Sequence, residues 1–158
     1  MTMTDGDLAA HLANVAGKIL IEVRESGMFE GKSLGKAGDQ TANQFLVHAL
    51  REQRAEDGLL SEEEKDNAER LAKERVWIVD PVDGTREYGE ARADWAVHVA
   101  LCIDGRPEIG AVALPGLGLV LRTDTPAAVP DAAGTPRMVV SRTRPAAEAV
   151  SVAETIGA

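Results

Sequence analysis

Hydrophobic positions near the start of the chain recur with a helical period. From Asp7 to about Val23 apolar side chains follow one another every three or four residues, which predicts an amphipathic helix. Four glycines between Glu25 and Gly38 predict a loop, and Asp39 then stands where the N-cap of a second helix is expected. The chain is therefore expected to open with two helices.

Further along, the pattern changes to short extended segments bounded by Gly, Pro or Asp. The segments that predict strands are residues 58–60, 76–79, 95–103, 108–114 and 118–123. The last three are expected to be antiparallel neighbours, and the segment before Asp80-Pro81 is expected to stop there. Together the elements predict an α+β fold, with two helices packed on a largely antiparallel sheet.

The length of 158 residues suits one domain with one core. We expect residues 1–125 to form the main α+β domain, and residues 126–136, rich in Pro, Ala and Gly, to form a linker or long loop. Residues 137–158 are expected to begin a further domain, with a strand at 138–140 and a helix at 145–156.

The net charge of the chain limits the kinds of molecule it is expected to bind. Seventeen Lys and Arg against twenty-six Asp and Glu give a net charge of −9, which argues against nucleic acid or an anionic membrane as a partner. An anionic substrate would need added positive charge, and a divalent metal is the obvious candidate. The single Cys102 closes no intramolecular disulfide, and the N-terminus lacks a signal-peptide pattern, so a cytoplasmic location is predicted.

Five acidic residues fall at the edges of predicted elements. They are Asp39, Glu62, Glu63, Asp80 and Asp83. Some of them would converge if the strand before Glu62 lies beside the strand before Asp80. Two carboxylates about 4 Å apart repel by roughly 4 kcal/mol at an effective dielectric of 20, and a cation removes that repulsion. Oxygen ligands without His or Cys favour Mg²⁺ or Mn²⁺.

The most informative segment is residues 76–85, VWIVDPVDGT. Pro81 fixes the backbone directly after Asp80, and Gly84 permits a sharp bend, so the side chains of Asp80 and Asp83 can face one point. If a turn begins at Gly84, the N–H groups of Gly84 and Thr85 would hold a phosphate oxygen opposite the metal.

DPVDGT at residues 80–85 resembles the signature of the inositol monophosphatase superfamily, and LLSEE at 59–63 is similar to its acidic motif. DGTREY at 83–88 resembles the CysQ-type branch, the 3'(2'),5'-bisphosphate nucleotidases that act on 3'-phosphoadenosine 5'-phosphate. The resemblance extends through VVSRTR at 139–144 to the end of the chain. It implies the N-terminal half of a layered α/β/α/β/α fold and a Mg²⁺-dependent phosphomonoesterase of sulfur metabolism.

The resemblance also implies roles for individual residues. Residues matching the family's metal ligands are Glu62, Asp80 and Asp83, through their carboxylates, and Val82, through its carbonyl oxygen. Gly84 and Thr85 match the phosphate-holding turn, and Arg86 is expected either to bind a substrate phosphate or to pair with Glu87. Asp39 is expected to act with the Thr85 hydroxyl to orient the attacking water, and Glu62 to share in catalysis.

The implied mechanism is direct attack of water on phosphorus without a phosphoenzyme. Two or three Mg²⁺ ions, replaceable by Mn²⁺, would serve the reaction, and Li⁺ would inhibit it. Activity on inositol phosphates or fructose 1,6-bisphosphate stays open, and a homodimer is compatible with the resemblance.

Several structural interpretations stand beside the functional ones. Ser61 and Glu64 also suit a capping box, which would leave Glu62 free for metal. His98 lies in an alternating strand and is interpreted as structural. Relatives continue into a second half with a Trp-Asp motif, so the chain is expected to hydrolyse its substrate poorly, to expose apolar surface, or to be a noncatalytic truncated remnant.

Overall fold

The structure, a computed structural model, describes residues 3–66, 68–129 and 134–158. The chain divides into two compact units, Met1–Ala127 and Ala128–Ala158, and each is described by itself. Within the described residues, no helix combines the length and the apolar character needed to cross a bilayer. Because residues 130–133 lie outside the described residues, the linker predicted at 126–136 is described only in part.

Two long helices open the first unit, as predicted. α1 is Asp5–Glu25, and the Thr4 hydroxyl caps it by accepting a hydrogen bond from the Asp7 amide at 3.1 Å. α2 is Gly31–Gln53. The predicted loop up to residue 38 is therefore wrong for most of its length, and Asp39 lies inside α2 rather than at its N-cap.

The glycines of α2 serve close packing rather than chain flexibility. A Cβ added at Gly38 would lie 2.5 Å from Cε1 of Tyr88, and one at Gly35 would lie 2.9 Å from Cγ2 of Thr85. Both contacts are with α3, a short helix at Thr85–Gly89. The sequence pattern was misinterpreted because glycine is a poor helix former in isolation, yet here it lets two helices touch.

A mixed five-stranded sheet follows, in the order β1-β2-β3-β4-β5. Its strands are β1 Gly58–Ser61, β2 Arg75–Asp83, β3 Ala96–Ile103, β4 Arg106–Leu114 and β5 Leu119–Arg122. β1 and β2 are parallel and every other pair is antiparallel, so the predicted run of three antiparallel neighbours is confirmed. The prediction that the second strand stops at Asp80-Pro81 is wrong, because β2 continues to Asp83.

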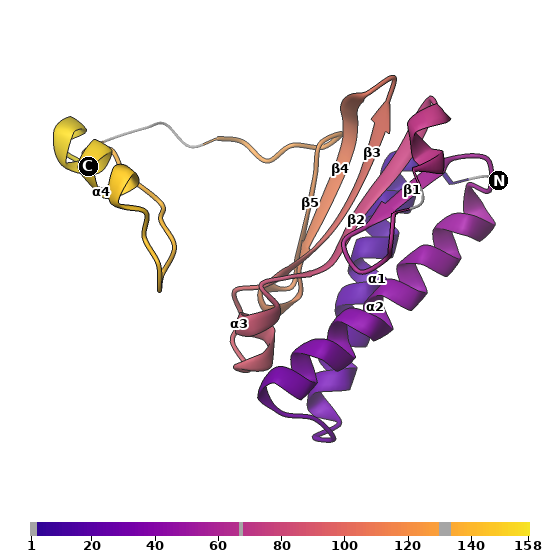
Figure 1. Ribbon diagram of the computed structural model, residues 1–158, viewed down its shortest axis with the longest axis horizontal. Helices are drawn as coiled ribbons and strands as arrows, with labels where there is room; N and C mark the ends of the chain where they lie inside the picture. The colour runs from indigo at the N-terminus through magenta and orange to yellow at the C-terminus, as the bar shows by residue number, and fades with distance from the viewer. Residues whose placement is uncertain (1–2, 67, 130–133) are drawn as a thin grey trace. The chain divides into compact units, whose positions relative to one another are not determined.

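The core lies between the helices and one face of the sheet (Figure 1). α1 packs on β3, β4 and β5, while α2 packs on β1, β2 and α3. Side chains from both layers, among them Leu20, Leu46, Trp77 and Leu101, are completely buried. On the opposite face of the sheet Ile78 is 37% exposed, so that face carries apolar surface in contact with solvent.

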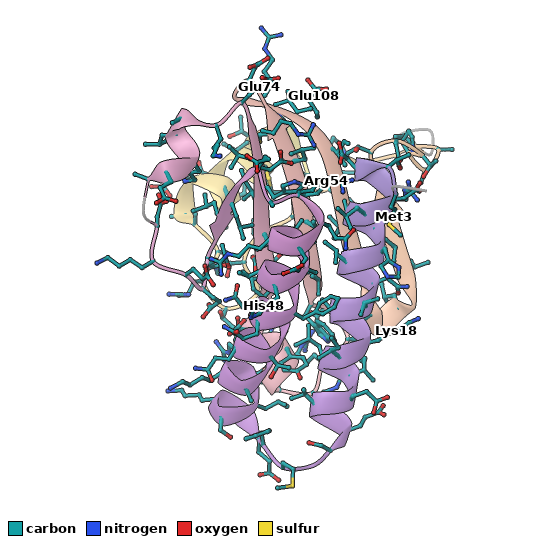
Figure 2. The ribbon with its side chains drawn as sticks, turned by 90° about the vertical axis from the view of Figure 1, so that its right-hand side faces the viewer. Met3, Lys18, His48, Arg54, Glu74 and Glu108 are labelled. Atoms are coloured by element: carbon teal, nitrogen blue, oxygen red, sulfur yellow. The ribbon has the colours of Figure 1, made fainter. Side chains whose placement is uncertain are left out.

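A network of ion pairs fixes one end of the helix layer to the sheet. Arg54 at the C-cap of α2 (Figure 2) bonds Asp5 at 2.8 Å and the Met3 carbonyl oxygen at 2.8 Å. Arg75 of β2 bonds Asp5 at 2.9 Å and Asp57 at 3.0 Å. The network ties both helices to the start of β2 and leaves the other end of that strand to form a site.

Two short 3₁₀ helices, η1 at Glu69–Ala72 and η2 at Pro115–Leu117, complete the first unit. In the second unit, α4 at Ala147–Ile156 ends at Gly157 and confirms the predicted helix. The strand predicted at 138–140 is wrong, since those residues are irregular and Val139 is 94% exposed. An apolar triplet forms a strand only where another strand can pair with it.

Candidate active site

A bulge at the end of β2 places Asp80 and Asp83 on the same face of the sheet. Asp80 lies opposite His98 of β3, whereas Asp83 lies opposite Ala96, so three steps along β2 match two along β3. Side chains alternate faces along a regular strand, and residues three apart would then point in opposite directions. The extra residue restores the common face, and a proline is tolerated at such a bulge.

The parallel pairing of β1 and β2 brings Glu62 to the same edge. Ser61 pairs with Val79, so the residues that follow this pair, Glu62 and Asp80, are neighbours. The Glu62 amide donates to the Val79 carbonyl oxygen at 3.3 Å. The Glu62 side chain lies near enough for its charge to raise the pKa of Asp80. The convergence of these two strand ends, on which the predicted acidic cluster depended, is present.

Ser61 holds this corner by means other than a helix cap. Its hydroxyl donates to Oδ1 of Asn43 on α2 at 2.6 Å, a buried contact, and accepts from the Glu63 amide at 3.2 Å. Glu64 forms an ion pair with Arg51 at 3.0 Å. Residues 62 and 63 form a turn and not a helix, so the alternative capping box at Ser61 and Glu64 is wrong.

The turn after β2 leads to Thr85. Gly84 adopts φ +88°, a left-handed conformation in which a side chain would be strained. The Thr85 hydroxyl donates to the Val82 carbonyl oxygen at 3.0 Å and is within hydrogen-bonding reach of Asp39. Contact of Gly35 with Thr85 explains this approach, because α2 carries both Gly35 and Asp39.

Asp39 is 8% exposed and lies among other acids. Its burial raises its pKa to about 7, and the charges of Glu63, Asp80 and Glu62 act in the same direction, while the nearby Thr85 side chain opposes them. Burial likewise raises the pKa of Asp80, helped by Glu62 and Asp83 and opposed by His98. The site therefore concentrates negative charge that a cation would relieve.

His98 is the residue that sequence reasoning missed. Its Nε2 lies 3.1 Å from Oδ2 of Asp83. Across the described part of the chain, no three His, Cys, Asp or Glu side chains are arranged to hold a metal ion. Only the cross-strand register could have pointed to His98, since no local motif surrounds it.

Two grooves adjoin these residues. One, of about 560 Å³, is lined by Glu62, Asp80, Asp83 and His98 together with apolar side chains of the exposed sheet face. The other, of about 600 Å³, is lined by Thr85, Arg86 and Lys32 with glycines of α2 and α3. Arg86 forms an ion pair with Glu90 at 2.8 Å.

The acidic strand ends, the left-handed glycine and the buried aspartate can be compared with known proteins now that their arrangement is described. Residues 6–156 match the inositol monophosphatase family. The chain belongs to this family. The predicted family resemblance is thus confirmed, and so is the α+β fold of two helices on a five-stranded sheet.

One relative and two solved structures illustrate the match within the inositol monophosphatase family. The chain is 49% identical to the 3'-phosphoadenosine 5'-phosphate phosphatase of Mycobacterium leprae, over 90% of this chain and 58% of that protein. CysQ from Bacteroides thetaiotaomicron superposes with TM-score 0.64 at 28% identity, covering 73% of this chain and 44% of that one. Staphylococcal IMPase-II gives TM-score 0.75 at 19% identity, covering 98% and 62%.

The chain therefore spans little more than half the length of the relative it matches at 49% identity. The fold of the family is established for the part that is aligned. Activity and substrate are treated below as proposals.

Proposed function

We propose that the chain carries the metal- and phosphate-binding part of a Mg²⁺-dependent phosphatase that converts 3'-phosphoadenosine 5'-phosphate to AMP. The observation that carries this proposal is the convergence of Asp39, Glu62 and Asp80, with Asp83 on the same sheet face as Asp80. The name of the Mycobacterium leprae relative supports this choice of substrate. We assign the site to residues 1–125, with residues 137–158 as the start of a further domain.

The donors of this site suit a hard divalent cation. Glu62, Asp80 and Asp83 offer carboxylate oxygens, and Val82 offers a carbonyl oxygen whose second lone pair is free to bind while the first accepts from Thr85. Burial and mutual repulsion make the charged form of Asp80 costly, and bound Mg²⁺ would relieve that cost. Two or three ions, Mn²⁺ as a substitute and inhibition by Li⁺ belong to the same proposal.

Different residues of the chain would orient the water, accept its proton and bind the phosphate. When bound, Mg²⁺ supplies positive charge that neutralises the phosphate and acidifies a water molecule. Asp39 and Thr85 orient the attacking water, and the Asp39 carboxylate is placed to accept its proton. Amides of Gly84 and Thr85 hold a phosphate oxygen, and Arg86 contacts the substrate from the neighbouring groove.

The test is release of phosphate from 3'-phosphoadenosine 5'-phosphate by the purified 158-residue chain with and without Mg²⁺. We expect release that requires Mg²⁺ and is slower than that of the Mycobacterium leprae relative, since apolar sheet surface beside the site is open to water. Asp83→Asn should abolish it. Activity that persists in EDTA or in Asp83→Asn would refute the metal assignment.

Substrate choice is tested in the same assay. Inositol 1-phosphate and fructose 1,6-bisphosphate are the competing substrates, and either one turning over faster than the nucleotide would replace the proposed activity. A Thr85→Val variant should lose activity that Thr85→Ser retains, because only serine keeps the hydroxyl that bonds Val82 and approaches Asp39. If no substrate is hydrolysed by a folded, Mg²⁺-loaded chain, the noncatalytic alternative is favoured.

A further inference from the structure

His98 of β3 lies close to both aspartates of β2. In the register of β2 and β3 it stands opposite Asp80, while Asp83 stands opposite Ala96, two residues away on the same face. Its Nε2 is 3.1 Å from Oδ2 of Asp83, and the two side chains are 40% and 62% exposed. The same imidazole acts on Asp80, whose pKa it lowers.

In the hydrogen bond between His98 and Asp83, the imidazole is the donor. An ionised carboxylate only accepts hydrogen bonds, so the contact requires that Nε2 of His98 carries the hydrogen. One oxygen of Asp83 is then engaged, and Oδ1 stays available for a cation. Asp83 is more than half exposed and is followed by the left-handed Gly84, so without a partner its side chain would have several rotamers to choose from.

We propose that His98 is a positioning residue that restrains the Asp83 carboxylate, through a bond from Nε2 to Oδ2, and so favours its binding of a divalent cation. This inference rests on the metal site of the proposed function. Hydrogen-bond partners of metal-ligating groups typically contribute 10- to 100-fold to metal affinity or activity, because they remove the ordering that binding would otherwise require.

Titration of the 158-residue chain with Mn²⁺, followed by electron paramagnetic resonance, measures the effect directly. We expect His98→Leu to raise the Mn²⁺ dissociation constant by about 10-fold or more. We expect His98→Gln to restore most of the affinity, because its amide nitrogen occupies a position close to Nε2 of histidine and also donates. His11→Leu, at an exposed position of α1, is the matched control and should bind Mn²⁺ as the unmodified chain does.

Urea unfolding of each variant in EDTA separates positioning from folding. A purely structural role would lower stability equally in His98→Leu and His98→Gln and would give no selective rescue of Mn²⁺ affinity. If His98→Leu does not fold, His98→Asn takes its place, because its shorter amide falls short of Asp83. Unchanged or tighter Mn²⁺ binding in the folded variant overturns the inference, as does a His98→Gln variant that binds as weakly as His98→Leu.

Phosphate release, measured on the same samples, distinguishes this inference from the proposed function. A chain whose Mn²⁺ affinity depends on His98 but which hydrolyses no phosphate ester keeps the positioning role and overturns the proposed activity. A chain that hydrolyses the nucleotide but whose Mn²⁺ affinity is independent of His98 supports the proposed activity and overturns the positioning role. Absence of Mn²⁺ binding in the unmodified chain overturns the positioning role, whatever the phosphate assay gives.

Discussion

Gly38→Ala tests whether the contact between α2 and α3 determines how the site is assembled. The added methyl carbon would lie 2.5 Å from Cε1 and 3.1 Å from Cζ of Tyr88, and 3.0 Å from Cδ2 of Leu20. The Tyr88 ring has little freedom to move away. Its hydroxyl donates to the Leu20 carbonyl oxygen at 2.7 Å, and its ring packs edge-on against Trp95 at 5.0 Å between centroids.

The size of the effect follows from two opposing contributions. Overpacking of a filled core typically costs about 1–3 kcal/mol, while replacing a helical glycine by alanine typically gains about 1 kcal/mol. Since the tyrosine ring is held by a hydrogen bond and by ring packing, we expect the upper part of the first range. The net loss in the free energy of unfolding should be about 1–2 kcal/mol, which is a 5- to 30-fold change in the folded-to-unfolded ratio.

Urea unfolding followed by tryptophan fluorescence measures this difference, since Trp77 and Trp95 are both buried. The matched control is Gly6→Ala in α1, where the new methyl carbon displaces the side chain of Asp124 from its exposed ion pair with Arg122, an interaction typically worth under about 1 kcal/mol and offset by the gain from replacing a helical glycine. That variant should be as stable as the unmodified chain or slightly more stable. A Gly38→Ala protein at least as stable as Gly6→Ala would refute the packing argument.

Three further outcomes can be measured. The pKa of Asp39 is about 3.8 in the unfolded chain and about 7 in the folded, metal-free chain, so the folded state binds this proton more tightly. The free energy of unfolding should therefore fall as the pH rises from about 4 to 7. In urea titrations in EDTA, Asp39→Asn should lose this part of the pH dependence. Asp57→Ala should lower the free energy of unfolding by about 2–4 kcal/mol, because it removes the acceptor of the Arg75 guanidinium and of the Trp77 indole N–H. Asp66→Ala, which removes the exposed ion pair with Arg70, should lower it by under about 1 kcal/mol. Equal losses in urea unfolding would contradict this. In Gly35→Ala the new methyl carbon would contact the Thr85 side chain, so the rate of phosphate release should fall even where urea unfolding shows little loss of stability. An unchanged kcat would count against the proposed role of Thr85.

The sequence predicted elements where the local pattern and the tertiary packing agree. α1 has an uninterrupted apolar stripe, and the antiparallel strands alternate between tight turns, so both were predicted correctly. The start of α2 was not, because glycines at 31, 35 and 38 look like a loop until the partner helix is known. The end of β2 was missed for a similar reason, since the effect of Pro81 depends on a bulge that only pairing with β3 reveals.

Some residues of the candidate site could likewise be predicted from the sequence, and others could not. Glu62 and Asp80 could be brought together from sequence, because both follow short apolar strands that a parallel pairing would place side by side. Asp39 was singled out by family resemblance and not by periodicity, which placed it at a helix start instead of inside α2. His98 acquires its partner through cross-strand register, and no spacing along the chain encodes that contact.

The extra residue in β2 makes this segment more sensitive to its length than to its composition. One residue added beside Pro81 or Val82, with no second bulge to absorb it, would leave Asp80 and Asp83 three ladder positions apart and turn the Asp83 carboxylate inward, among the apolar side chains beneath α2. Most exchanges of one side chain for another at these two positions keep the count intact and leave Asp83 facing outward. Among related chains, insertions between the two aspartates should therefore be far rarer than substitutions.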